Sequence, residues 1–295
     1  MRTRTFAAAV LATAAAAALS LSAGTAEAAS AVHSHINAIH PGFQAASSHS
    51  GHTLLGTGPH TNLGRSHIKN TEYSTNWSGY AADSTTYNSV TASWTQPTAT
   101  CSSSSTDEYS AFWVGIDGYS SSTVEQTGTE SDCISGTAYY AAWYEAYPAA
   151  SNEYSDTVKA GDSFTATVTA SGTTFDLVLK DATEGWTENT SVSVSSAAKS
   201  SAEVIAEAPS DSSGVLPLAD FGAVDFTGAT ANSTAFASLS PIQIDMETSS
   251  GTLEATTSTI SSESFSVTWD SSGSSSSSGG SGGPGGGGGG GGGGR

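Results

Sequence analysis

The chain is 295 residues long and has a formal net charge of −19 at pH 7. All seven of its histidines lie before residue 70, so the segment from Thr71 to Asp270 contains none. This absence excludes a Ser-His-Asp or Cys-His mechanism in that segment and removes the commonest metal ligand. If the segment is catalytic, carboxylates must transfer the protons, which indicates acidic working conditions.

The same segment is strongly acidic. It contains 26 Asp and Glu residues against three lysines, a formal charge of −23. Free Asp and Glu titrate at about pH 3.9 and 4.3, so protonation at about pH 3 to 4 removes most of the self-repulsion. A halophilic or merely soluble surface is the alternative interpretation, although neither requires the loss of histidine.

Residues 1–28 are predicted to be a secretory signal peptide. Arg2 and Arg4 precede an apolar run from Phe6 to Leu21, and Ala26-Glu27-Ala28 fits a small-residue cleavage site. A membrane anchor is the alternative, but the run is short and mostly alanine. We therefore expect a secreted, extracellular protein that does not associate with a membrane.

Residues 29–70 are predicted to be a His-rich propeptide or a linker. They show little apolar periodicity, and Arg65 and Lys69 are their only fixed charges. Their formal charge rises from +2 toward +9 as the seven histidines are protonated. The contrast with the acidic segment favours a propeptide that docks on it, inhibits it and responds to pH. A disordered linker is the alternative.

Residues 71–270 are predicted to form one all-β domain, an antiparallel β-sandwich of two packed sheets. Turn signals recur every 8 to 12 residues or so between runs rich in Val, Thr, Tyr, Phe and Trp. The alternation from Phe164 to Val168 is typical of a half-buried strand, and no long amphipathic helix is evident. The expected strands are Ser89 to Thr95, Tyr109 to Ile116, Thr137 to Tyr147, Ser163 to Thr169, Thr174 to Leu179, Ser191 to Val194 and Ser264 to Trp269.

Cys101 and Cys133 are the only cysteines and are predicted to form a disulfide bond in an exported chain. A thiol nucleophile is the alternative, but the domain offers it no histidine partner. Residues 271–295 are rich in Ser and Gly and are predicted to be a flexible tail.

Two apolar segments are interrupted by charged or amide side chains. One runs from Ala111 to Gly118 and resumes from Val124 to Gly128; the other runs from Ala202 to Pro209. Such groups on a half-buried strand cost stability unless they are hydrogen-bonded or useful. These segments are therefore the candidates for the active site.

Together with five further landmarks, these segments resemble the glutamic peptidases of the eqolisin family, acid endopeptidases that use one Gln and one Glu. The resemblance covers about Thr75 to Phe226. The landmarks in family order are Asn76-Trp77-Ser78-Gly79-Tyr80, Trp94 with Pro97, Phe112 to Gly118, Gln126-Thr127-Gly128, Trp143-Tyr144-Glu145 with Pro148, Gly161-Asp162, Ala202 to Glu207, and Asp220-Phe221-Gly222. Val204 departs from the family, which usually has Trp there. The resemblance implies a concanavalin- or lectin-like sandwich with the active site on the concave face of one sheet.

The resemblance also assigns the catalytic pair, with the glutamine at Gln126 and the glutamate at Glu207. Glu203 competes for the second role because side chains alternate along a strand, so it shares a face with Glu207. We prefer Glu207 because the family's catalytic carboxylate closes this motif, and we expect Glu203 to support it.

Four further residues are candidates for supporting or binding roles. Trp113 and Asp117 match family positions beside the site, and we expect Asp117 to orient the Gln126 amide and Trp113 to wall the pocket. Tyr144 and Glu145 are candidates for substrate contact, although a structural role is an equal alternative.

The sequence thus predicts a secreted acid endopeptidase that acts on polypeptides and is made as a zymogen. We expect no cofactor, no metal and no nucleic-acid partner, and the family suggests a monomer. Pepstatin insensitivity is expected because the chain has no Asp-Thr-Gly pair. A non-catalytic carbohydrate-binding module with aromatic platforms is the alternative. A glycosidase that uses Glu203 and Glu207 as its two carboxylates is a third possibility. That pairing is geometrically strained, because residues four apart on a strand lie about 13 Å apart at their bases.

Overall fold

The computed structural model describes residues 71–102, 106–211 and 214–273. The predicted signal peptide, the His-rich segment and nearly all of the predicted tail lie outside these residues. In the described part, strands alternate with loops and a single 3-10 turn at Phe236–Leu239 is the only helix. No helix found there is long and apolar enough to cross a membrane.

The strands of the described region follow one another along the chain, most of them short. They are β1 (Thr71–Ser74), β2 (Trp77–Ala82), β3 (Ser89–Thr95), β4 (Ala111–Ile116), β5 (Val124–Ile134), β6 (Thr137–Tyr147), β7 (Asn152–Glu153), β8 (Ser163–Ser171), β9 (Thr174–Asp181), β10 (Trp186–Ser193), β11 (Ala202–Glu207), β12 (Ser210–Asp211), β13 (Gly214–Val215), β14 (Ala223–Ala231), β15 (Thr234–Ala235), β16 (Ile242–Glu247), β17 (Leu253–Thr257) and β18 (Phe265–Trp269). All seven predicted runs contain or overlap an observed strand.

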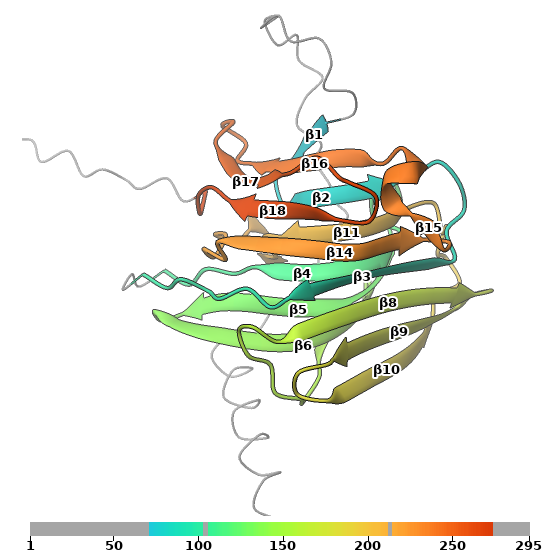
Figure 1. The fold of residues 1–295 in the computed structure, drawn as a ribbon, viewed down its shortest axis with the longest axis horizontal. Helices are drawn as coiled ribbons and strands as arrows, with labels where there is room; N and C mark the ends of the chain where they lie inside the picture. The colour runs from blue at the N-terminus through green and yellow to red at the C-terminus, as the bar shows by residue number, and fades with distance from the viewer. Residues whose placement is uncertain (1–70, 103–105, 212–213, 274–295) are drawn as a thin grey trace, which may run out of the picture. The chain divides into compact units, whose positions relative to one another are not determined.

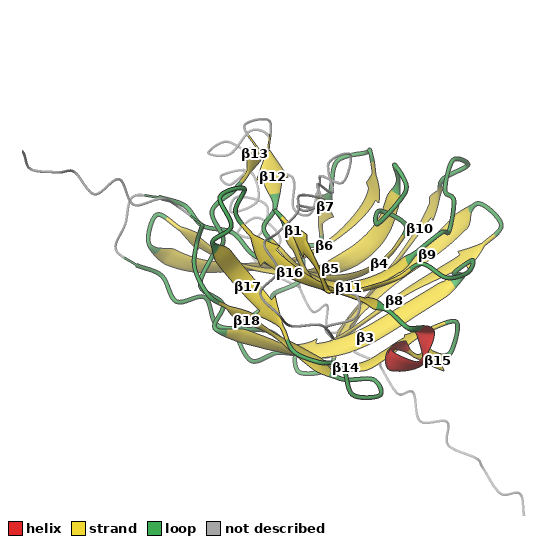
Figure 2. Ribbon diagram, turned by 90° about the horizontal axis from the view of Figure 1, so that it is seen from above, coloured by secondary structure: helices red, strands yellow, loops and turns green. Residues whose placement is uncertain are grey.

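The main sheet is one hydrogen-bonded path that folds over on itself (Figure 1). It starts as β10-β9-β8-β3-β14, which we call the β3 layer. It turns over through β18 and β17 and returns as β16-β2-β11-β4-β5-β6-β7, the β4 layer. Figure 2 shows the two curved layers edge-on. Apart from β1, which pairs with β16 in parallel, neighbouring strands are antiparallel. The predicted antiparallel sandwich is confirmed.

The core between the layers follows from two-residue alternation. On β8, Phe164, Ala166 and Val168 are buried, while Thr165 between them is exposed. On β4 and β11, by contrast, every residue is buried. One face of these two strands packs against the β3 layer, so their other face is a second buried surface, where the candidate site lies.

The predicted disulfide is present. Cys101 and Cys133 are bonded, with their Cα atoms 5.4 Å apart. The bond joins the segment that precedes β4 to the end of β5. It therefore fixes the entry to the two strands that carry much of the candidate site.

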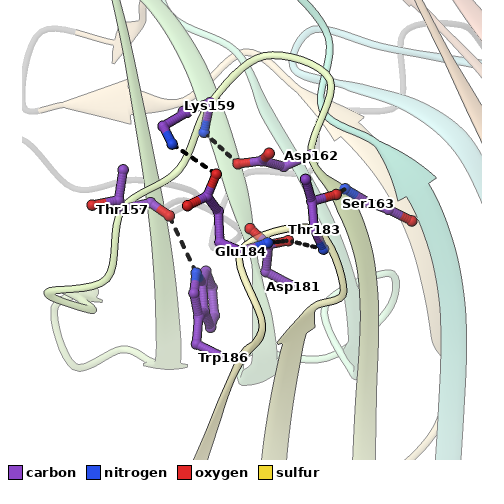
Figure 3. A network of polar contacts seen from close by, with 8 residues as sticks. All are labelled: Thr157, Lys159, Asp162, Ser163, Asp181, Thr183, Glu184 and Trp186. Carbon is purple, nitrogen blue, oxygen red and sulfur yellow. Dashed lines mark hydrogen bonds and ion pairs between the residues drawn. The ribbon is translucent and has the colours of Figure 1, made fainter.

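A polar network anchors the connection from β7 to β8 onto the β9–β10 hairpin (Figure 3). Trp186 Nε1 donates to the Thr157 carbonyl at 3.2 Å, and Lys159 Nζ pairs with Glu184 at 2.7 Å. The backbone N–H of Lys159 also donates to Asp162 at 2.7 Å. The segment that follows β6 and β7 is thus held in place.

Candidate active site

Four adjacent strands, β11, β4, β5 and β6, carry the candidate site. We call the face of the β4 layer that points away from the β3 layer the site face. Trp113, Gln126, Glu145 and Glu207 all lie on it. Gln126 is the register partner of Gly115 on β4 and of Glu145 on β6. The structure therefore brings the predicted catalytic residues onto one surface.

Gly115 leaves room for the indole ring of Trp113, and Gly128 leaves room for the backbone around it. A Cβ atom at Gly115 would lie 2.8 Å from Trp113 Cζ3, and one at Gly128 would lie 2.2 Å from the Phe112 carbonyl oxygen. Trp77 packs edge-on against the same indole, with ring centroids 5.1 Å apart. These contacts fix where the indole N–H points.

Two hydrogen-bond donors hold the carboxylate of Glu207. Trp113 Nε1 donates to one oxygen at 2.8 Å, and Asn76 Nδ2 donates to the other at 3.2 Å. Trp113 was expected only to wall the pocket, and it also orients the candidate base. Hydrogen bonds to an ionised acceptor are stronger than neutral ones, so this arrangement favours a fixed carboxylate.

The hydrogen bond from Asn76 was not predicted from the sequence. Ser74 Oγ donates to Asn76 Oδ1 at 3.0 Å and accepts the backbone N–H of Trp77 at 3.2 Å. Because its amide oxygen is occupied by Ser74, Asn76 presents its nitrogen to Glu207. The Ser-x-Asn turn before β2 is the only local signal, and its partner lies 131 positions away.

Gln126 donates from Nε2 to Glu145 Oε2 at 2.7 Å. Burial raises the pKa of Glu145 well above its usual range, and the charge of Glu207 raises it further, whereas the Gln126 hydrogen bond lowers it. Glu145 therefore lies close enough to Glu207 for the two charges to interact. Gln126, Glu145 and Glu207 form one electrostatic group.

The expected role of Asp117 needs correction. Its carboxylate accepts the backbone N–H groups of Lys199 at 2.7 Å and of Ser200 at 2.8 Å, and also the Ser200 hydroxyl. Asp117 thus fixes the loop before β11, and Glu145 is the carboxyl group that binds the Gln126 amide nitrogen.

Glu203 lies on the same face as Glu207 but in different surroundings. It is fully buried, which raises its pKa well above the usual range, and the charges of Asp117 and Glu125 raise it further. Glu203 thus belongs to a carboxyl cluster at the start of β11, whereas Glu207 at the other end interacts with Glu145. This separation favours Glu207 as the base.

Tyr144 is not part of the site face. It neighbours Glu145 on β6, so its side chain points to the opposite side of the sheet, where it packs against Tyr154 with ring centroids 5.3 Å apart. Val204, the departure from the family pattern, also lies in the core between the layers. Of the two predicted substrate contacts, only Glu145 lies beside Gln126.

The candidate pair is enclosed in this form of the chain, because Gln126 and Glu207 both have 0% of their surface exposed. Among residues 71–102, 106–211 and 214–273, no group of three or more His, Cys, Asp and Glu side chains is arranged to hold a metal ion. Within the site, Glu207 presents a carboxyl group and Gln126 presents an amide.

Comparisons with known proteins found related sequences. The sequence profile of the Peptidase A4 family matches residues 75–269. Aspergillopepsin-2 of Aspergillus niger is 32% identical over 187 residues, which cover 56% of this chain and 66% of that protein. Scytalidopepsin B of Scytalidium lignicola is 33% identical over 172 residues, 56% of this chain and 59% of that protein. The chain thus spans less than two thirds of the length of these relatives.

Two solved structures share the fold. A crystal structure of scytalido-glutamic peptidase with a transition state analog inhibitor has a TM-score of 0.58 and 28% identity, covering 66% of this chain and 98% of that chain. SCP-B, a member of the Eqolisin family of peptidases in a complex with the tripeptide Ala-Ile-His, has a TM-score of 0.55 and 27% identity over the same shares.

Proposed function

The chain belongs to the peptidase A4 (eqolisin) family, and from this we propose that it is a secreted acid endopeptidase whose catalytic pair is Gln126 and Glu207. The observation that carries the proposal is the placement of these two side chains. Glu207 is held by hydrogen bonds from Trp113 and Asn76, and Gln126 is held by Glu145, on adjacent strands of one face.

The pair divides the reaction between a base and an oxyanion donor. Glu207 takes a proton from a water molecule as the water oxygen attacks the scissile carbonyl carbon. The Gln126 amide donates a hydrogen bond to the developing oxyanion, and one such donor contributes about 2.7 to 4 kcal/mol of transition-state stabilisation. When the C–N bond breaks, protonated Glu207 gives its proton to the leaving amine, which regenerates the carboxylate.

An acidic optimum follows from this choice of groups. Unperturbed glutamate carboxyl groups titrate at about pH 4.3, so carboxylates are feeble bases at neutral pH and are well matched to acidic conditions. The absence of histidine from residues 71–270 leaves no group that is better suited to neutral pH. The proposal also includes insensitivity to pepstatin, because the chain lacks the Asp-Thr-Gly pair of an aspartic dyad.

The test is digestion of a denatured protein across pH 2 to 7 or so, with and without pepstatin. We expect activity to peak at about pH 3 to 4, to be unaffected by pepstatin, and to fall by about 10²- to 10³-fold in kcat in Gln126→Ala. A neutral optimum, inhibition by pepstatin, or full activity of Gln126→Ala would contradict the proposal.

The proposal extends to residues 29–70 as a propeptide that inhibits the domain of residues 71–270. The charge contrast between the two segments supports it. Acidified full-length protein should shorten itself near Asn70, and Glu207→Gln protein should not. Self-shortening of the Glu207→Gln protein would refute the assigned base.

A further inference from the structure

We propose that Glu145 is a positioning residue which, as a neutral carboxyl group, accepts a hydrogen bond from Gln126 and fixes the orientation of its amide. The inference rests on the proposed function of Gln126 and adds a residue to it. Glu145 was a candidate for substrate contact with a structural role as an equal alternative, and the contacts of its side chain favour the positioning role.

The geometry favours Glu145 as the partner that orients the amide. Gln126 and Glu145 lie directly opposite each other on β5 and β6, and the Nε2 to Oε2 distance is 2.7 Å. Side chains at opposite positions on antiparallel strands have Cβ atoms about 4.5 to 5.5 Å apart, so the contact needs no strained rotamer. A glutamine amide can flip its nitrogen and oxygen, and an acceptor that holds the nitrogen end selects one orientation.

Burial and the nearby acidic groups favour the neutral form of Glu145, whereas the hydrogen bond from Gln126 acts in the opposite direction. Glu207 on β11 is the carboxylate whose charge acts on Glu145, and Glu203 occupies the same cross-strand row three strands away. Glu153 on β7 pairs with the residue two before Glu145, and Tyr139 donates to that carboxylate at 3.3 Å. Glu145 itself is fully buried. Burial and like charges both disfavour ionisation of a carboxyl group.

A neutral Glu145 is also what the proposed reaction needs. Two carboxylates that share a site do not both ionise readily, so a charge on Glu145 would oppose the charge that Glu207 needs as base. As a neutral acid, Glu145 accepts the Gln126 N–H through its carbonyl oxygen and adds no charge. One carboxyl group then acts as the base while the other positions the amide.

The kinetic test uses Glu145→Gln and Glu145→Ala, with Glu125→Gln as a buried control on the other face of β5. Glu145→Gln keeps a neutral acceptor, so kcat at about pH 3.5 should stay within about threefold of wild type, and activity should persist to higher pH. Glu145→Ala should lower kcat by about 10- to 100-fold and change KM by less than about threefold. The inference would be overturned if Glu145→Gln lost as much activity as Glu145→Ala. It would also be overturned if Glu145→Ala kept the wild-type kcat.

A second readout does not depend on activity. In ¹⁵N-labelled protein, the side-chain amide signals of Gln126, assigned by their absence from Gln126→Ala, should be protected from exchange in wild type and in Glu145→Gln. They should lose protection in Glu145→Ala. Unchanged signals in Glu145→Ala would refute the positioning role, and this conclusion holds even if the protein proves inactive on peptides. If the wild-type protein is inactive but its Gln126 signals are protected, only the proposed function is refuted.

Discussion

Glu207 is held by one donor from β4 and one from the turn before β2, and the hydrogen bond from Asn76 can be removed without touching the indole of Trp113. Asn76→Ala should lower kcat by roughly tenfold, because a hydrogen bond to a charged group is worth about 1.5 to 3 kcal/mol and only part of that is specific to the transition state. Steady-state kinetics on a peptide substrate at acidic pH measure the effect. Asn152→Ala, an exposed change on β7, is the matched control, and equal kcat values for the two variants would show that Asn76 has no part in orienting Glu207.

At this scale the sequence predicts the catalytic candidates better than their partners. Gln126 and Glu207 were assigned from the family resemblance that the local motifs support, and the structure brings both to one face. The partners depend on strand register: Asn76 reaches Glu207 because β2 pairs with β11, and Glu145 reaches Gln126 because β5 pairs with β6. Asp117 was misassigned because it follows β4 directly, with a φ of 71° that turns the chain toward Ser200.

At the scale of single strands, β4 depends on glycine to seat Trp113. Gly115→Ala places a Cβ atom 2.8 Å from the indole, and a side chain can move away from it. We expect a displaced ring, a lost hydrogen bond to Glu207 and a fall in kcat of about tenfold or more, with a modest loss of stability. Kinetics, tryptophan fluorescence and thermal unfolding together measure this.

Gly128→Ala provides the comparison on β5. Its Cβ atom would lie 2.2 Å from the carbonyl oxygen of Phe112, which is backbone and cannot move alone. This variant should therefore unfold at a clearly lower temperature than Gly115→Ala. If Gly115→Ala keeps full activity, the packing of the indole does not set the orientation of Glu207.

The strands themselves were predictable where they alternate or are rich in β-branched and aromatic residues, as in β3 and β6, whose bounds match the expected runs. β5 was harder to delimit, because Glu125, Glu130 and Asp132 give it the composition of an exposed segment. The structure buries ten of its eleven residues, since the layer packs on both of its faces. Burial of carboxyl groups depends on their neighbours in space, which local composition does not reveal.

At the scale of the whole molecule, the acidity of the domain is partly internal. Burial raises the pKa of Glu125 to about 8, and it raises the pKa values of Glu130 and Asp132 well above their usual range, with repulsion from neighbouring acidic groups adding to the effect. The pKa of Glu254, on β17, rises to about 7 for the same reason. The sequence predicted repulsion between acidic side chains on the surface. The structure shows that some of the acidic side chains are buried instead, where their raised pKa values favour the protonated form.

These raised pKa values predict the pH dependence of stability. A carboxyl group whose pKa is higher in the folded than in the unfolded chain contributes stability at low pH, and that contribution is lost as the pH rises through the folded value. The melting temperature should therefore be highest in acid and fall between about pH 5 and 8. Glu125→Gln should raise the melting temperature at about pH 8 and change it little at about pH 4. Asp83→Asn, an exposed change, should do neither, and a melting temperature that rises with pH would contradict the account.

The class of fold was thus accessible from the sequence, because strand alternation is a property of the chain itself, and the acidic chemistry stays a prediction from the absence of histidine. The path of the sheet was not, since it depends on β14 pairing with both β3 and β18 and on the return through β16. That path is what brings β11, whose sequence lies far from β5, next to β4 and creates the site face.

The most direct test of the central claim compares two isosteric changes on β11, Glu207→Gln and Glu203→Gln, in peptide hydrolysis at acidic pH. Both residues are buried glutamates on one face of the same strand, so the two changes replace the same carboxyl group with the same amide and are matched in volume. The account predicts that Glu207→Gln lowers kcat by about 10³-fold, the range of a lost general base, while Glu203→Gln stays within about tenfold of wild type. A reversed order, or hydrolysis by Glu207→Gln at the wild-type rate, would contradict it.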